Sequence, residues 1–434
     1  MTFVISHPMD APLSALDKGV PAIETNLPLD AVGAQQWRLL KEDLPLPVAV
    51  LKEDCLRHNS QWMKSFLADG GARLAPHGKT TMSPGLFDLQ LADGAWAITV
   101  STPHQVQVVR RFGYQRIFLA NQLIGAKAID FVISELARDA SFEFFFLVDS
   151  VDNVKAIAKA ARDAKLQRPL EALVEIGYPG GRTGCRSVNE AIDLAHAIHE
   201  TNGAIVLRGV EGFEGLLKGA DNAATLELVS AFLDSIVALA RACDEERLYG
   251  SETVILSAGG SSFYDIVVEK LGSAALTKQT IILVRSGCYI THDSVLYAKA
   301  VQALRERNPA LADAHGGLAP ALEVWAYIQS RPEPEKAIAG LGKRDISYDD
   351  QPIALVWYRP GVDMERPQPL SPDHRVTRLN DQHCHLEIPA DSPLKVGDMV
   401  GFGVSHPCLT FDKWRVLHVV DHNYQITSSV RTYF

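Results

Sequence analysis

One lysine, Lys79, stands where a short apolar run breaks into a polar turn, in the stretch RLAPHGKTTMSP at residues 73–84. A lysine amine becomes a nucleophile toward carbonyl groups when burial or neighbouring cations lower its pKa. His77 and the small residues Gly78, Thr80 and Thr81 around it suit such a site. The pattern is that of a reactive amine at the mouth of a barrel. A solvated loop lysine is the alternative, because lysine side chains are almost always exposed.

Glycine-rich turns end three of the later apolar runs: GFEG at 212–215, SAGGSSFYD at 257–265 and RSGCYITHD at 285–293. Such turns expose backbone N–H groups that bind phosphate. In (β/α)8 barrels, phosphate sites are often built by the loops after strands seven and eight. The second and third turns therefore predict a phosphate site, with ordinary tight turns as the alternative. A lysine after strand one and a phosphate site after strands seven and eight is the layout of a pyridoxal-phosphate enzyme on a barrel.

A second constellation is His406-Pro407-Cys408. On an extended strand, residues two apart point to the same face, and imidazole plus thiolate is a soft ligand pair that suits zinc. The pair predicts a metal site, although a lone His-x-Cys is also compatible with incidental packing. His383 and His385, in DQHCHLEIP, are the other candidate histidines nearby.

The elements that must position these residues are short apolar runs alternating with helix-length amphipathic segments. Eight runs follow one another: RLAPHGK, AWAITVS, RIFLANQ, FEFFFLVDS, LEALVEIGY, IVLRGVEGF, TVILSAGG and TIILVRSGCYI. Their near-continuous Val, Ile, Leu and Phe content is typical of parallel strands buried on both faces. The count favours an α/β fold with a (β/α)8 barrel, and a doubly wound open sheet is the alternative.

The chain divides into three regions. Residues 1–45 carry Pro, Asp and Gly with little periodicity and predict an N-terminal arm. Residues 46–308 begin with the strand-like PVAVLKED and contain the barrel pattern. Residues 309–434 consist of strand-like stretches separated by Pro, Asp and Gly turns, which predicts a second, mainly antiparallel β domain.

Composition narrows the class of partner. The 434 residues are 47% hydrophobic and 22% charged, with a net charge of −10 and a pI near 5.8. Because the chain has no excess of basic residues, nucleic acid and anionic membranes are disfavoured as binding partners, and small molecules are the expected ligands. No apolar run approaches the roughly 18 residues of a membrane span, and the N-terminus lacks a signal pattern, so we expect a cytoplasmic protein. The six scattered cysteines are expected to be reduced.

Taken together, these motifs show a family resemblance from residue 46 to the C-terminus. Six segments occur in an order that resembles the D-threonine aldolase and D-serine dehydratase group. They are RLAPHGKTTM, VEIGYPGGRTG, EGFEG, SAGGSSFYD, RSGCYITHD and SHPCLTFDKW. These pyridoxal-phosphate enzymes are related to the N-terminal barrel of alanine racemases. The resemblance implies an alanine-racemase-like barrel with a C-terminal β domain that carries a metal site.

The resemblance also implies roles for individual residues. Lys79 would form the Schiff base with pyridoxal phosphate, beside His77. Arg182 would face the cofactor ring, with a solvated turn arginine as the alternative. An arginine there would leave the ring nitrogen unprotonated and so make the cofactor a weaker electron sink. The metal would then have to contribute more to catalysis. His383, implied to be catalytic, fits the family's histidine better than His385, and a partly buried strand residue is the alternative for either. His406 and Cys408 would hold a divalent metal, expected to be zinc. The residues implied to line the phosphate are Gly259, Gly260, Ser261, Gly287, Cys288 and Tyr289.

The implied activity is conversion of 3-hydroxy-D-amino acids, of the D-serine or D-threonine type, to a 2-keto acid and ammonia. A cysteine at position 408 is the dehydratase-like choice, whereas members that cleave the carbon–carbon bond tend to carry aspartate there. Aldol cleavage, racemisation and a non-enzymatic cofactor carrier stay open as alternatives. The family implies a homodimer, and the apolar strands around Trp325 and Trp357 are expected to offer surface for it.

Overall fold

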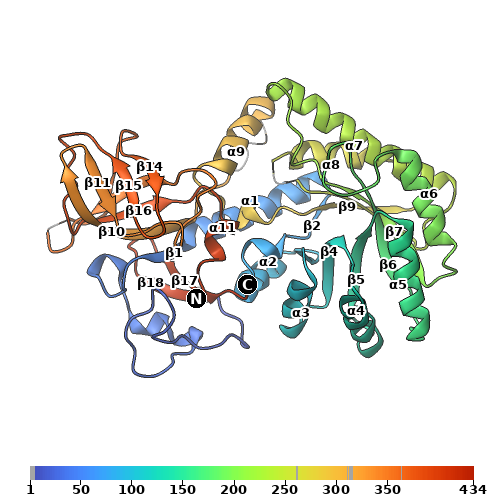
Figure 1. Ribbon diagram of the computed structural model, residues 1–434, viewed down its shortest axis with the longest axis horizontal. Helices are drawn as coiled ribbons and strands as arrows, with labels where there is room; N and C mark the ends of the chain where they lie inside the picture. Colours follow the sequence, from blue (N-terminus) through green and yellow to red (C-terminus); the bar gives the residue numbers. More distant parts are fainter. Residues whose placement is uncertain (1–4, 261, 310, 312–315, 363) are drawn as a thin grey trace. The chain divides into compact units, whose positions relative to one another are not determined.

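The computed structural model describes residues 5–260, 262–309, 311, 316–362 and 364–434. The chain forms two compact units. The first, called the β unit here, contains Met1–Met63, Thr80–Asp93 and Cys288–Phe434, and the second, the barrel unit, contains Lys64–Lys79 and Gly94–Gly287. Helix α1 (Glu53–Gly70) runs from one unit into the other. Figure 1 shows the parallel strands of the barrel unit and the antiparallel strands of the β unit as separate sheets.

Eight parallel strands form the barrel unit, in the order β2-β9-β8-β7-β6-β5-β4-β3. The strands are β2 (Arg73–Leu74), β3 (Ile98–Val100), β4 (Arg116–Gln122), β5 (Glu143–Val148), β6 (Leu170–Ile176), β7 (Ile205–Gly212), β8 (Thr253–Ala258) and β9 (Gln279–Val284). The sheet closes because the Thr99 N–H donates to the Pro76 carbonyl and His77 bridges Thr99 in parallel. The predicted barrel is confirmed, and each of the eight apolar runs supplies one strand.

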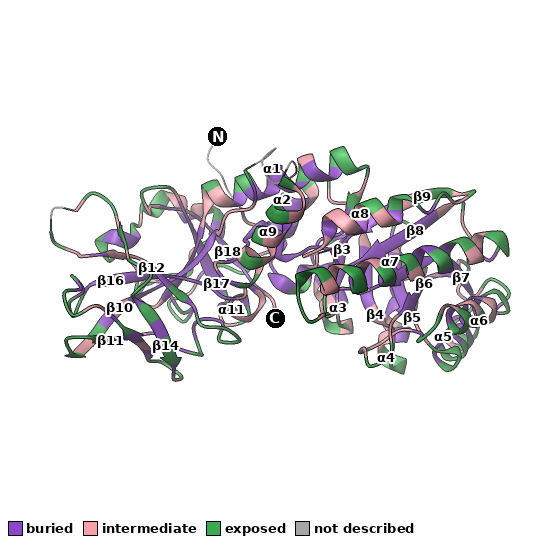
Figure 2. Cartoon of the chain, turned by 90° about the horizontal axis from the view of Figure 1, so that it is seen from above, coloured by how far each residue is buried: buried purple, intermediate pink, exposed green. Residues whose placement is uncertain are grey.

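The barrel interior is apolar because residues such as Phe118, Phe145, Leu173 and Leu283 point inward from different strands. Helices follow the strands in the sequence, as the parallel order requires. In the barrel unit they are α3 (Pro103–Arg111), α4 (Ala126–Arg138), α5 (Val151–Asp163), α6 (Val188–His199), α7 (Asn222–Glu245) and α8 (Tyr264–Gly272). Figure 2 shows the strands buried and the helices buried on one face only.

Helix α7 corrects one sequence expectation. It is long and apolar enough to cross a membrane by length and composition alone, so the expectation that no segment qualifies is wrong. Its buried stripe includes Phe232, Leu233, Ile236 and Leu239, and Phe232 and Ile236 lie against Gly212 at the end of β7. The high hydropathy of α7 is therefore that of a helix packed on a sheet.

The β unit is a mainly antiparallel sheet. Its main path is β13-β12-β16-β10-β1-β17-β18, and β11, β15 and β14 extend it from β10. Its strands are β1 (Val48–Lys52), β10 (Leu322–Glu333), β11 (Lys336–Ala339), β12 (Ile353–Tyr358), β13 (Gln368–Pro369), β14 (Arg375–Leu379), β15 (Cys384–Glu387), β16 (Met399–Gly403), β17 (Val416–Val420) and β18 (Ile426–Arg431). Its helices are α2 (Pro84–Ala92), α9 (Leu296–Arg307) and α11 (Cys408–Phe411).

These units differ from the predicted divisions at 45/46 and 308/309. Strand β1 lies in the β unit because it pairs with β10 on one side and with β17 on the other, although the sequence grouped it with the barrel. Residues 288–307, at the end of the predicted barrel, also cluster with the β unit. The chain therefore leaves the β unit after Met63, within α1, returns to it for Thr80–Asp93, and returns again directly after Gly287.

The N-terminal arm packs into the core of the β unit. Leu13, Val20, Leu39 and Leu44 join a buried cluster around Trp325. Short 3₁₀ turns interrupt the arm at Leu29–Ala31, Gly33–Gln35 and Leu39–Lys41. The arm is thus an irregular segment whose apolar side chains are spaced to fill one face of a sheet.

His418 of β17 holds the arm and is expected to make stability depend on pH. Its ring nitrogens lie 3.0 Å from the Gly19 carbonyl oxygen and 2.7 Å from Ser429 Oγ. Burial lowers the pKa of His418 to about 4, against an ordinary value of 6.5. The unfolded chain therefore binds more protons between these values. The contribution of neutral His418 to the free energy of unfolding is complete above pH 6.5. It is lost as the pH falls toward 4, by up to about 1.4 kcal/mol per pH unit.

The prediction is checked by thermal unfolding at about pH 7.5, which lies above this window, and at about pH 5.5, which lies within it. His418→Gln should be less stable than the natural protein at the higher pH but lose less stability on acidification. The exposed His422→Gln is the matched control. An equal acid-induced drop in His418→Gln and the natural protein would contradict the assignment.

Candidate active site

Lys79 lies just beyond the carboxyl end of β2, in a 3₁₀ turn at Gly78–Thr80. Its side chain is exposed, so burial by the chain does not activate its amine. Its neighbour His77 is held at the barrel end by its bridge to Thr99, and Ser101 Oγ lies 3.3 Å from His77 Nε2. The position agrees with the predicted place of a reactive lysine, because barrel enzymes build their sites at this end of the strands.

His77 is kept neutral. Burial lowers the pKa of its imidazole well below the ordinary value, and the positive charges of Lys79, Arg285 and Arg182 lower it further. The Nδ1 atom of His77 is buried without a partner among the described residues. A neutral ring with one unsatisfied nitrogen can hydrogen-bond a polar ligand without adding charge.

Charged side chains occupy the same end of the barrel. Arg285, which directly follows β9, forms an ion pair with Glu211 of β7, and both side chains are buried. Burial raises the pKa of Glu211 to about 7, although Arg285 favours the charged form. Arg182, after β6, places its guanidinium 4.4 Å from the centre of the Phe213 ring. The barrel end therefore combines cations with a carboxyl group that titrates near neutrality.

The turn after β8 already holds an anion from the protein itself. Gly259 N and Gly260 N donate to the two carboxylate oxygens of Glu214, at 3.0 and 2.7 Å. Glu214 is completely buried, and Gly260 has a positive φ of 73° that favours glycine. These two N–H groups were predicted to face a phosphate. A phosphate could use them only by displacing Glu214.

The barrel end nevertheless fits a polar, anionic ligand such as pyridoxal phosphate. Three buried polar atoms there, His77 Nδ1, Glu211 Oε2 and Arg285 Nε, have no partner within the described part of the chain. Buried polar groups in folded proteins are nearly always satisfied, by protein, water or ligand. With Lys79 and Arg182 beside them, these atoms provide both an amine and fixed positive charge for such a ligand.

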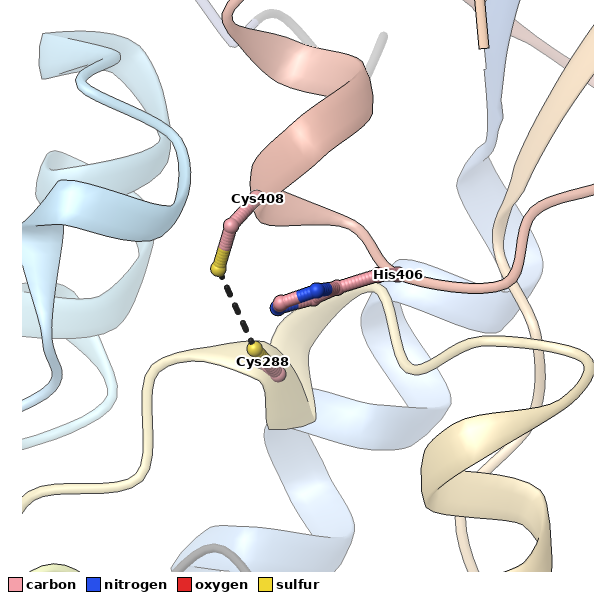
Figure 3. A group of neighbouring side chains, drawn as sticks. All are labelled: Cys288, His406 and Cys408. Atoms are coloured by element: carbon pink, nitrogen blue, oxygen red, sulfur yellow. Dashed lines mark hydrogen bonds between the residues drawn. The ribbon is translucent and has the colours of Figure 1, made fainter. Parts of the chain in front are cut away.

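A compact group of metal-binding side chains lies in the β unit. The ligand atoms of Cys288, His406 and Cys408 are all within 4.8 Å of one another. Figure 3 shows the two sulfur atoms facing each other, with the imidazole beside them. The sulfurs are 3.6 Å apart, and Thr80 Oγ1 lies 3.4 Å from Cys408 Sγ. The sequence predicted the second and third members as a metal pair, and the structure adds the first.

The electrostatics of this group favour a charged form of Cys408. Its contact with Cys288 and its neighbour His406 lower the pKa of the Cys408 thiol well below the ordinary value. Burial alone would lower the pKa of His406, but Cys408 and Asp349 outweigh burial and raise this pKa to about 9. Asp349 Oδ2 lies 2.6 Å from His406 Nδ1, which leaves Nε2 for a ligand. A carboxylate behind a histidine is a common support for metal-ligating imidazole.

The predicted geometry of this pair needs correction. His406 and Cys408 do not lie on an extended strand, because β16 ends at Gly403. Pro407 has helical angles, φ −60° and ψ −45°, and Cys408 begins helix α11. The proline ring fixes φ at a value that suits the start of a helix. The two side chains converge through this turn rather than through strand alternation.

The other predicted residues are distributed as follows. Tyr289 is buried in the β unit and interacts with Gln90, and burial raises the pKa of its phenol. Gly287 is buried at the end of the turn after β9, and Ser261 lies outside the described residues. His383 is exposed in the turn before β15 and is not part of the Cys288 group. Its catalytic role stays a prediction.

Sequence reasoning overlooked Glu211, Glu214 and Arg285. The signal was present, since EGFEG places two carboxylates at the end of an apolar run and VRSG places a cation there. A charged residue at the carboxyl end of a buried strand is unusual unless it is paired or used by a ligand.

Comparison with known proteins bears out the family resemblance. Residues 321–420 match the family model described as "Putative serine dehydratase domain". The chain is 25% identical over 253 residues to the D-threo-3-hydroxyaspartate dehydratase of Delftia sp. (strain HT23). That alignment covers 58% of this chain and 63% of the dehydratase, which is less than two thirds of its length.

Solved structures with the same fold include a D-threonine aldolase from Filomicrobium marinum. Its TM-score is 0.73, and it is 20% identical over 92% of this chain and 97% of the aldolase. The Delftia sp. HT23 dehydratase has a TM-score of 0.69 and 22% identity over 92% of this chain and 99% of its own. An alanine racemase of Clostridium difficile 630 has a TM-score of 0.58 and 14% identity over 89% and 98%. A cysteine-to-alanine variant of the dehydratase has been solved in a metal-free form. The fold is therefore an alanine-racemase-like barrel with an antiparallel β domain.

Proposed function

We propose that this protein is a pyridoxal-phosphate- and metal-dependent lyase that converts 3-hydroxy-D-amino acids to a 2-keto acid and ammonia. The observation that carries the proposal is the group of His406, Cys408 and Cys288, supported by Asp349. This group is tied along the chain to the candidate cofactor site. Thr80, which contacts Cys408, directly follows Lys79, and Cys288 directly follows Gly287.

When bound, pyridoxal phosphate would supply an electron sink for the substrate α-carbon, and the metal would supply a Lewis acid for the 3-hydroxyl group. Lys79 Nζ would hold the cofactor and then accept the α-proton. His77 would accept or donate a hydrogen bond as a neutral ring. Arg182 would provide positive charge that cannot be lost by deprotonation. The metal ligands would be His406 Nε2 and Cys408 Sγ.

Three relationships support elimination of water as the reaction. The curated relative is a 3-hydroxyaspartate dehydratase, and residues 321–420 match a serine dehydratase family model. One solved form of that relative is described as metal-free and carries a cysteine substitution. A thiolate ligand in this chain favours zinc over hard cations. Loss of the α-proton and the 3-hydroxyl group would leave an enamine, which hydrolyses to the keto acid and ammonia.

Aldol cleavage is the second candidate, favoured by the fold shared with a D-threonine aldolase. Cleavage requires a base for the 3-hydroxyl proton, whereas elimination requires the hydroxyl oxygen to leave with its electrons. Racemisation would need a second acid–base group on the opposite face of the substrate and no metal.

The proposal is tested with a panel of D- and L-3-hydroxyamino acids, with and without a chelator. We expect ammonia release from the D-enantiomers only. Chelation should abolish this release, and zinc should restore it. Unchanged turnover after complete metal removal would contradict the role of the metal, and conversion confined to L-enantiomers would contradict the substrate class.

Assembly provides a separate prediction. We propose a homodimer with two-fold symmetry, buried over more than about 1,200 Å². The strand around Trp325 was expected to offer interface surface, but Val324, Trp325 and Ala326 are buried within their own chain. Strand β12 keeps Ile353 41% exposed and remains available. Sedimentation of the loaded enzyme should show the dimer, and a monomer with full activity at high dilution would contradict it.

A further inference from the structure

We propose that Cys288 is a third protein ligand of the metal, so that the site is a two-cysteine, one-histidine zinc centre with a single open position. This inference deepens the proposed function and rests on it only for the use of the metal. The sequence assigned Cys288 to the phosphate site. A phosphate would need only its backbone N–H, which leaves the side chain for another task.

The sulfur positions already match a shared zinc ion. Two thiolates bound to one tetrahedral zinc at about 2.3 Å lie about 3.8 Å apart. Cys288 Sγ and Cys408 Sγ are 3.6 Å apart in this structure. The histidine nitrogen completes a triangle with all three ligand atoms within 4.8 Å. The ligands therefore need little rearrangement to surround an ion.

The surroundings hold each ligand in place. Cys288 begins a 3₁₀ turn, Cys288–Ile290, and its side chain is 5% exposed. Cys408 begins α11 with its sulfur against Thr80. His406 is oriented by Asp349 at Nδ1, and the Tyr297 ring packs edge-on against the imidazole with centroids 6.4 Å apart. A ligand set drawn from two segments and held by neighbouring side chains is preorganised for one ion.

The ligand types predict which ion binds. Two thiolates and a neutral imidazole form a soft set with net charge −2, which selects zinc over magnesium, calcium or manganese. Three protein ligands around a tetrahedral ion leave one position, as in catalytic zinc sites. The 3-hydroxyl group of a substrate is the ligand class that this position would accept. A site with only His406 and Cys408 would keep at least two positions open to water.

X-ray absorption at the zinc edge of the resting natural protein, kept in reductant, tests the inference without a mutation. We expect two sulfur scatterers per zinc at about 2.3 Å. One sulfur per zinc would overturn the assignment of Cys288.

Titration of metal-free protein with cobalt and zinc provides the second test. The natural protein is compared with the variants Cys288→Ser, Cys408→Ser and Cys55→Ser. In Cys288→Ser the thiolate-to-cobalt charge-transfer absorption should fall to about half, and zinc affinity should fall about 100-fold or more, because loss of a supporting residue alone costs 10–100-fold. The partly buried Cys55 lies outside the metal group, so Cys55→Ser should match the natural protein. Retained circular dichroism verifies folding.

The outcomes separate this inference from the proposed function. If Cys288→Ser keeps the charge-transfer absorption and zinc affinity of the natural protein while Cys408→Ser loses both, Cys288 is not a ligand. That result would leave the proposed metal-dependent lyase intact. If zinc has two sulfur ligands but a chelator does not change the rate of ammonia release, the assignment of Cys288 is supported and the proposed function is contradicted.

Discussion

Replacement of Lys79 by alanine is expected to abolish covalent attachment of pyridoxal phosphate and nearly all turnover. Lys79 is the lysine at the end of β2, next to the neutral His77 and the unpaired polar atoms of the barrel end. Its removal takes away both the anchoring amine and the proposed base. General acid–base groups alone contribute about 10²–10⁴-fold, so we expect a loss of about 10⁴-fold or more.

Borohydride reduction followed by peptide mapping measures the attachment directly. In the natural protein the pyridoxyl label should be on Lys79, and in Lys79→Ala it should be absent. Lys155→Ala, on the exposed side of α5, is the matched control and should keep label and activity. A label on another lysine of fully loaded natural protein would show that the site is misassigned.

Replacement of Cys408 by alanine is expected to remove the metal and most of the turnover while the cofactor stays attached to Lys79. The contact with Cys288 and the neighbouring His406 lower the pKa of the Cys408 thiol well below the ordinary value, which favours the thiolate form that binds a metal. Loss of a Lewis acid worth several kcal/mol corresponds to a rate decrease of about 10²–10³-fold or more.

Metal content, cofactor absorption and ammonia release are measured on the same sample. Zinc should fall below one equivalent in Cys408→Ala, with the cofactor band unchanged, and Cys55→Ala should retain all three properties. A normal rate in a metal-free Cys408→Ala would remove the metal from the mechanism.

The barrel could be predicted from sequence because its signal is local. Runs such as FEFFFLVDS and TVILSAGG are apolar on both faces, and only a sheet covered by helices buries them in that way. The placement of β1 could not be predicted by the same reasoning. Its partners, β10 and β17, are far away in the sequence, and nothing in PVAVLKED indicates which sheet it joins.

The site was predictable in residue type more than in geometry. Lys79, His406 and Cys408 were found because their chemistry and spacing are unusual. The role of Glu214 as the partner of Gly259 and Gly260 was not, because a glycine-rich turn looks the same whichever anion fills it. Cys288 was assigned through its backbone, and only the folded chain brings its sulfur to Cys408. Strand β16 ends at Gly403 and Pro407 has helical angles, so the proximity of His406 and Cys408 was predicted from a wrong local geometry.

Product analysis with D-threonine tests the central claim most directly, because elimination and aldol cleavage start from the same substrate and need the same cofactor and metal. The zinc-loaded natural protein should produce 2-ketobutyrate and ammonia in equal amounts, and chelation should stop both. Glycine and acetaldehyde as the main products would make this protein an aldolase and contradict the proposed dehydratase.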